Sequence, residues 1–233
     1  ELPDENTSAS IATDEMGKDE NRITYPLVVL SHGSIYGLTQ AYREIAFEFA
    51  HRGYVVLASS YRGRGGREGR SQGHPQLARG EVLDLLQLVQ IGRQIEYIDS
   101  QRIAMLGFED GATTALLGIQ RSNVFQIAIL VSPDVFSGMA EYSYTGRKIL
   151  QKRSKEIFGR KLSENELIRE LYYREGFRDS VRITMPMLVM STGGDVGRRE
   201  LRYFVTNLRR EGQNPQLLEY PTMFTGFLTA PDN

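Results

Sequence analysis

The chain has 233 residues, of which 40% are hydrophobic, which fits one large domain or two small ones. Its 28 Lys and Arg are balanced by 29 Asp and Glu, whereas proteins that coat nucleic acids usually show a clear basic excess. The absence of cysteine excludes disulfides, thiolate metal sites and a cysteine nucleophile. No run approaches the ~18 apolar residues of a membrane-spanning helix. We therefore expect a globular protein with neither a nucleic-acid partner nor a membrane span.

Residues 1–22 differ from the rest, with seven acidic residues and few apolar ones. This composition predicts an acidic N-terminal tail before a single domain at 23–233, with one short strand at 10–13. The segment lacks the basic and apolar parts of a signal peptide. The compartment stays open, because the chain could be cytoplasmic or exported with its signal already removed.

Short apolar runs alternate with helical patterns along most of the chain, which is typical of βαβ units. Continuous apolar strands indicate a sheet that is covered on both faces. The pattern predicts an α/β fold with a doubly wound, mostly parallel sheet. The expected strands are 26–31, 54–59, 102–106, 125–131, 187–191 and 216–220, and the expected helices are 39–52, 77–96, 112–121 and 198–211.

Residues 137–179 interrupt this alternation, because they are helical in pattern, rich in charge and without a strand signal. We interpret them as a helical insert before the fifth strand. Its tyrosines suggest either a lid over a pocket or an exposed pair of amphipathic helices. These tyrosines are Tyr142, Tyr144, Tyr172 and Tyr173.

The carboxyl end of the third predicted strand carries the most informative motif, since ligands of open α/β sheets bind at that edge. Gly107-Phe108-Glu109-Asp110-Gly111 lies between a buried strand and a helix. It has the form G-x-S-x-G of a nucleophile elbow, with Glu109 in the place of serine. The glycines leave room for a sharp turn, so we expect a strained backbone at Glu109.

Several further segments accompany this motif, and together they resemble the α/β-hydrolase superfamily. The similarity is greatest to the branch that contains dienelactone hydrolases and prolyl-oligopeptidase-like serine peptidases, and it spans roughly residues 25–227. The segments are PLVVLSHGS, FAHRGYVVLASSYRGRGGREG, EVLDLLQLVQIGRQIEYIDSQRIAMLGFEDGA, MPMLVMSTGGD and NPQLLEYPTMFTGF.

The resemblance implies three triad positions, and two of them hold unsuitable residues. Glu109 stands at the serine position, Asp195 at the acid position and Thr225 at the histidine position. The oxyanion hole would use the backbone N–H groups of Asp110 and of a residue near Ser34. A serine hydrolase needs both its nucleophile and its base. We therefore expect a protein without serine-hydrolase catalysis, acting as a binding or regulatory module.

Two alternatives remain open. An active esterase- or peptidase-type hydrolase could use Glu109 and Asp195 with a histidine from another loop, and His32 and His74 are the candidates. The second alternative is that the protein is an altered copy of an active enzyme. Asp195 also suits a helix N-cap, and His51 falls at the end of a surface helix.

Arginines after the second strand are candidates for holding a phosphate or carboxylate ligand, and they are Arg62, Arg64 and Arg67. They could equally be solvated or pair with Glu109, which we expect to have an arginine partner from 62–70. A small molecule in the cleft is the expected partner. The sequence has no P-loop, no H-E-x-x-H and no metal-ligand cluster, so it implies no cofactor and no metal. The oligomeric state stays open.

Overall fold

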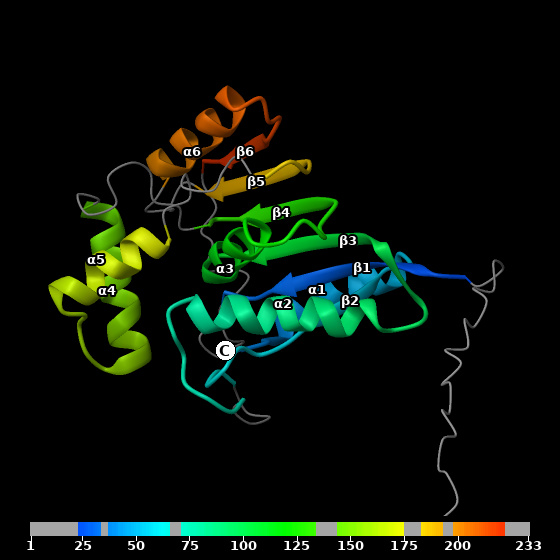
Figure 1. The fold of residues 1–233 in the computed structure, drawn as a ribbon, viewed down its shortest axis with the longest axis horizontal. Helices are drawn as coiled ribbons and strands as arrows, with labels where there is room; N and C mark the ends of the chain where they lie inside the picture. Colours follow the sequence, from blue (N-terminus) through cyan, green and yellow to red (C-terminus); the bar gives the residue numbers. More distant parts are fainter. Residues whose placement is uncertain are drawn as a thin grey trace, which may run out of the picture.

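The computed structural model of the protein describes residues 23–33, 37–65, 71–133, 144–174, 183–192 and 198–221. The predicted acidic tail and its short strand lie outside these residues. The described part contains a six-stranded sheet with helices on both sides and a helical insert at one end (Figure 1).

The sheet has the strand order β2-β1-β3-β4-β5-β6, and every neighbouring pair is parallel. This confirms the predicted α/β fold with a mostly parallel sheet. The strands match the predicted apolar runs, except that β3 extends further at both ends. The strands are β1 (Tyr25–Ser31), β2 (Val55–Ala58), β3 (Ile98–Phe108), β4 (Ile127–Val131), β5 (Met187–Thr192) and β6 (Gln216–Tyr220).

Alternate residues of the central strands enter two separate cores, which explains why these strands are apolar throughout. In β1, Leu27 and Val29 face a core that includes side chains of α2 (Arg79–Arg93), α3 (Asp110–Ile119) and α6 (Arg198–Arg210). Val28 and Leu30 face the opposite core, where Tyr42 of α1 (Gln40–His51) packs. All four β1 side chains are at most 2% exposed.

Helix α2 begins two residues later than predicted. Leu77 and Ala78 have φ angles of 50° and 82°, so the backbone at this point is left-handed and cannot belong to an α-helix. Leu77 is buried in a cluster with side chains of the insert. Tertiary packing therefore overrides the helical pattern of this sequence and turns the chain sharply before α2.

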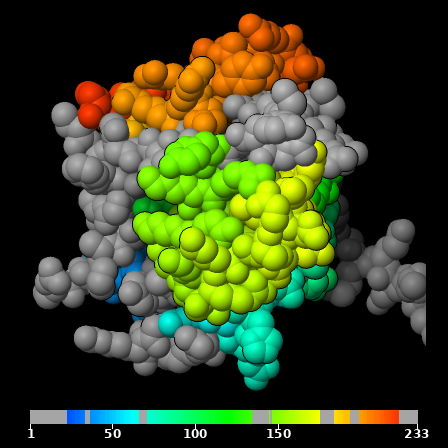
Figure 2. Space-filling model, turned by 90° about the vertical axis from the view of Figure 1, so that its left-hand side faces the viewer, coloured from blue at the N-terminus to red at the C-terminus, as the bar shows by residue number. Residues whose placement is uncertain are grey.

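The insert contains two helices, α4 (Tyr144–Phe158) and α5 (Glu164–Tyr173), as the helical pattern predicted. The start of α5 has a capping box, in which Ser163 accepts from the N–H of Glu166 and the Glu166 carboxylate accepts from the N–H of Ser163. Both helices lie at the end of the sheet to which the strands point (Figure 1). Seen from that end, they cover the middle of the molecule (Figure 2).

No helix within the described ranges is both long and apolar enough to cross a membrane.

Candidate functional site

Glu109 occupies the sharp turn between β3 and α3, as the motif predicted. Its backbone angles are φ 51° and ψ −120°, which a residue with a side chain rarely adopts. The turn is held because the N–H of Glu109 donates to the carbonyl of Val131 at 2.7 Å. The strained backbone expected of an elbow is thus confirmed, and Glu109 stands at its tip.

The glycines beside Glu109 allow close backbone contacts that any side chain would prevent. A Cβ at Gly111 would lie only 2.3 Å from the carbonyl oxygen of Ser31 and 2.4 Å from that of His32. A Cβ at Gly107 would lie 2.6 Å from Cα of Ala112. The first turn of α3 therefore presses directly against the end of β1.

The side chain of Glu109 folds over the loop that follows β1. A Cβ at Gly33 would lie 2.9 Å from Oε2 of Glu109 and 2.6 Å from the carbonyl oxygen of Phe108. The N–H of Gly33 donates to the hydroxyl of Tyr42 at 3.0 Å. The elbow carboxylate thus packs on the loop that the resemblance assigns to the oxyanion hole.

A buried hydrogen-bond chain joins the elbow to β1 and to the loop after β2. The hydroxyl of Ser31 donates to the carbonyl of Gly111 at 2.6 Å and also contacts the hydroxyl of Tyr61. Burial raises the pKa of Tyr61, which keeps its hydroxyl neutral as a hydrogen-bonding group. Three segments that are distant in the sequence are therefore held together beneath the elbow.

His32 is buried at 2% exposure, and its ring stacks on that of Tyr61 with centroids 4.7 Å apart. Its Nε2 accepts a hydrogen bond from the N–H of Tyr61 at 3.4 Å. This environment suits a packing role. The other two histidines, His51 and His74, are exposed.

Asp110 is the first residue of α3, and three arginines from three segments converge on its carboxylate. The guanidinium nitrogens of Arg174, Arg153 and Arg64 lie 3.4, 3.8 and 3.9 Å from a carboxylate oxygen of Asp110. Burial alone would raise the pKa of Asp110, but these three positive charges hold it at about 2. Asp110 is therefore ionised at neutral pH and links the helical insert to the elbow.

Arg62 and Arg64, in the loop after β2, pair with acidic side chains of the protein itself. Arg62 forms a two-pronged pair with Asp84 of α2, with Nε–Oδ2 at 2.9 Å and Nη2–Oδ1 at 2.5 Å. Arg64 pairs with Asp110. We expected an arginine partner for Glu109 from this loop, and the structure places the loop's Arg64 against the neighbouring carboxylate. Arg67 lies outside the described residues.

Three other predicted site residues also lie outside the described part of the chain. They are Ser34, Asp195 and Thr225. Their roles at the oxyanion hole, the acid position and the histidine position stay predictions.

The sequence did not predict that Arg153 and Arg174 of the insert pair with Asp110, nor that the hydroxyl of Tyr42 accepts from Gly33. Arg153 and Arg174 are two of many arginines in a charged segment, and no spacing distinguishes them. Arg174 is fully buried, which a charge-rich pattern does not suggest. Tyr42 lies in the predicted helix but gives no sign that its hydroxyl reaches Gly33.

One small cavity adjoins the elbow within the described residues. A cavity of about 10 Å³ is lined by His32, Gly33, Tyr61, Arg64, Ala78, Glu81, Asp110 and Thr114. Such a volume holds about one water molecule. Within the described ranges, His, Asp and Glu side chains form no group of three or more that could bind a metal ion.

Comparison with known proteins places these features in a family. The family model of the prolyl oligopeptidase family matches residues 40–223, which is most of the chain. The chain belongs to the prolyl oligopeptidase family. A search of curated proteins finds no significant match.

Solved structures of the family's fold agree with this assignment. A Pyrococcus horikoshii acylaminoacyl peptidase has 19% identity and a TM-score of 0.68, covering 88% of this chain and 34% of its own. Porphyromonas gingivalis dipeptidyl peptidase 4 has 19% identity and a TM-score of 0.63, covering 88% and 28%. A Pyrococcus furiosus esterase has 19% identity and a TM-score of 0.61, covering 87% and 75%. The chain thus spans about a third of the length of the matched peptidases, and these likenesses establish an α/β-hydrolase fold.

Proposed function

We propose that this member of the prolyl oligopeptidase family lacks serine-hydrolase catalysis and acts as a binding or regulatory module. The carrying observation is Glu109 at the tip of the elbow, with its carboxylate against Gly33. In the hydrolases that the chain resembles, this tip presents the nucleophilic serine.

The residues at the triad positions cannot perform the usual steps. A serine hydroxyl becomes nucleophilic only when a base within hydrogen-bond reach removes its proton. Glu109 offers no hydroxyl, and Thr225 at the proposed histidine position offers no base. Loss of the nucleophile or the base from a triad lowers the rate by about 10⁴- to 10⁶-fold.

The electrostatics of the elbow also oppose acyl transfer. An oxyanion hole stabilises negative charge as it develops on the substrate. A carboxylate from Glu109 over the same loop would repel that charge.

A set of four proteins tests this proposal: the wild type, Glu109→Ser, Thr225→His and the double variant. We expect fluorophosphonate labelling and aryl-ester turnover only in the double variant, because only there would serine, histidine and Asp195 form a triad. Circular dichroism of each protein would verify that the fold is intact.

The controls separate this proposal from its main alternative, an active hydrolase that uses Glu109, Asp195 and a histidine from another loop. Ester turnover by the wild type that is abolished in Glu109→Gln or Asp195→Asn would establish that alternative. Labelling of Glu109→Ser alone would mean that another residue already serves as the base, and the assignment of Thr225 would be wrong.

A further inference from the structure

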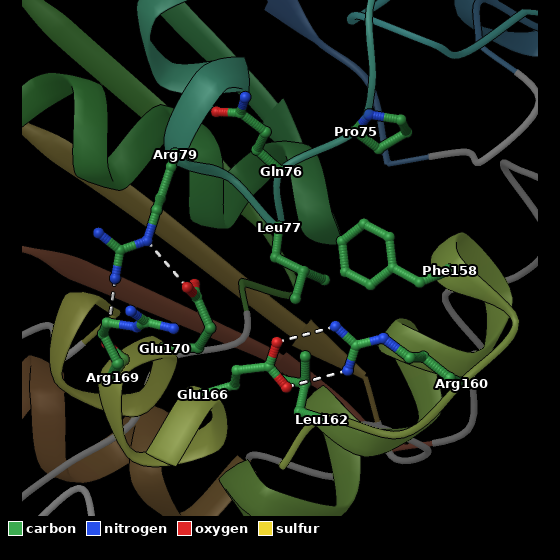
Figure 3. Close-up of a pocket in the computed structure, with 10 residues that line it drawn as sticks. All are labelled: Pro75, Gln76, Leu77, Arg79, Phe158, Arg160, Leu162, Glu166, Arg169 and Glu170. Atoms are coloured by element: carbon green, nitrogen blue, oxygen red, sulfur yellow. Dashed lines mark hydrogen bonds and ion pairs between the residues drawn. The ribbon is translucent and has the colours of Figure 1, made fainter. Parts of the chain in front are cut away.

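A second, much larger cavity lies between the body of the protein and the helical insert. Its volume is about 450 Å³, within the range of small-molecule sites. None of its described lining residues belongs to the elbow (Figure 3). The lining residues are Pro75, Gln76, Leu77, Arg79, Phe158, Arg160, Leu162, Glu166, Arg169 and Glu170.

One side of this cavity is apolar. Leu77 and Leu162 line it, and both are buried members of the cluster that joins the insert to the body. Phe158 is 40% exposed, and its ring stands opposite Leu77 in Figure 3. An aromatic ring that remains accessible beside buried leucines offers a contact surface for an apolar group.

The polar side of the cavity carries one positive charge in excess. Arg79 pairs with Glu170 at 2.8 Å, and Arg160 holds both carboxylate oxygens of Glu166 at 2.8 and 2.9 Å. Arg169 lies beside the Arg79–Glu170 pair (Figure 3), and its guanidinium makes no ion pair within the part of the chain described here. A guanidinium binds a carboxylate through two parallel hydrogen bonds, so Arg169 is suited to an anionic group.

The wall of the cavity is also a strained turn. Leu77 and Ala78 both have positive φ angles although neither is glycine, and such conformations are costly unless the surrounding structure enforces them. Here the burial of Leu77 among insert side chains enforces the turn, which places Pro75 and Gln76 along the cavity. The shape of the cavity therefore depends on docking of the insert.

We propose that this cavity binds a small amphiphilic monocarboxylate, with the carboxylate on Arg169 and an aromatic or branched apolar group between Leu77 and Phe158. The single excess charge matches a monoanion, and the apolar wall matches its hydrocarbon part. This site is separate from the elbow, so the proposal stands whether or not the elbow proves catalytic.

The test uses 4-phenylbutanoate as the probe, measured by calorimetry or ligand-observed NMR. We expect a dissociation constant on the order of 1 mM, as for a compound of this size. The alcohol 4-phenylbutanol and the amine 4-phenylbutylamine have nearly the same apolar body without the negative charge. We expect each to bind at least about tenfold more weakly.

Variants locate the site. Arg169→Gln should weaken 4-phenylbutanoate binding by about tenfold, and Phe158→Ala by about fivefold. Arg93→Gln is the matched control, because Arg93 is exposed at the far end of α2 and makes no ion pair within the described residues. It should leave binding unchanged, and thermal melting of each variant would verify folding.

The proposal is overturned if 4-phenylbutanoate fails to bind at 10-fold the expected dissociation constant. It is also overturned if the alcohol binds as tightly as the acid, or if a folded Arg169→Gln protein binds like the wild type. Hydrolase assays of the elbow variants do not bear on these outcomes.

Discussion

The elbow differs in its contacts from the seam, which is the region where Leu77 and Arg79 contact α4 and α5 of the insert. At the elbow, backbone meets backbone, since a Cβ at Gly111 would lie 2.3 Å from the carbonyl oxygen of Ser31. At the seam, side chains make the contacts. Arg79 pairs with Glu170. The ring centroid of Tyr173 lies 4.3 Å from Cζ of Arg79 and 4.9 Å from Cζ of Arg121. The described cavity that adjoins the elbow has a volume of about 10 Å³, whereas the cavity beside the insert has a volume of about 450 Å³.

This difference separates the geometry of the elbow from its chemistry. At the elbow, Gly111 packs against the end of β1 and Gly107 packs against Ala112, and neither contact involves the side chain at the tip. The seam also has a strained turn, at Leu77 and Ala78, but there buried side chains rather than close backbone contacts enforce it. Asp110 belongs to both regions, because it begins α3 and also holds Arg153 and Arg174 of the insert segment.

The largest effect is expected from Gly111→Ala, which would place a methyl group against two backbone carbonyls. Neither carbonyl can move without displacing β1, so we expect the free energy of unfolding to fall by about 3 kcal/mol or more. Urea denaturation measures the change. Gly118→Ala in the same helix is the control, because its Cβ would meet only the flexible ends of Leu85 at 3.1 Å and Leu86 at 3.9 Å. It should change stability by less than about 1 kcal/mol. Equal effects at the two sites would contradict the close approach at the elbow.

A smaller effect is expected from Asp110→Asn, and it should depend on pH. The pKa of Asp110 is about 2 in the folded protein and about 3.9 when unfolded, so ionised Asp110 favours the folded state. This contribution, on the order of 2 kcal/mol, is complete above about pH 5 and is lost as the pH falls toward 2. The wild type should therefore lose more stability than Asp110→Asn between pH 5 and pH 2, as measured by urea denaturation at each pH.

Asp99→Asn provides a comparison for this pH dependence, since Asp99 pairs with the exposed Arg102. Solvent screening weakens such a pair, so its removal should alter the pH profile less. If Asp110→Asn and the wild type lose stability in parallel, the arginine cluster does not link insert and elbow as described.

The smallest of the three effects is expected from Leu77→Ala, which should loosen the seam and leave the elbow intact. Removal of this buried leucine side chain should cost up to about 2 kcal/mol, because the seam can relax around it. Hydrogen exchange should show faster exchange in α4 and α5, with β3 unchanged. Leu83→Ala, at a position 63% exposed on α2, should change stability by less than about 0.5 kcal/mol. Faster exchange throughout β3 would show that the two regions unfold as one unit.

Much of the fold could be predicted from the sequence, because each strand is a short apolar run and each helix has its own periodicity. β6 matches its predicted range at both ends, and β5 and α6 differ by one residue. The start of α2 differs more, since the pattern at Leu77 is helical while its burial in the insert forces a left-handed turn. Local periodicity cannot report a contact with a segment that lies roughly 70 to 95 residues further along the chain.

The sequence by itself determined the elbow and its unusual tip, because two glycines around Glu109 between a strand and a helix specify a sharp turn through local sterics. It could not show which charges meet there. Arg153 and Arg174 reach Asp110 only because the insert packs on the carboxyl end of the sheet. Ion pairs and cavities depend on distances between elements, and only the tertiary structure brings those elements together.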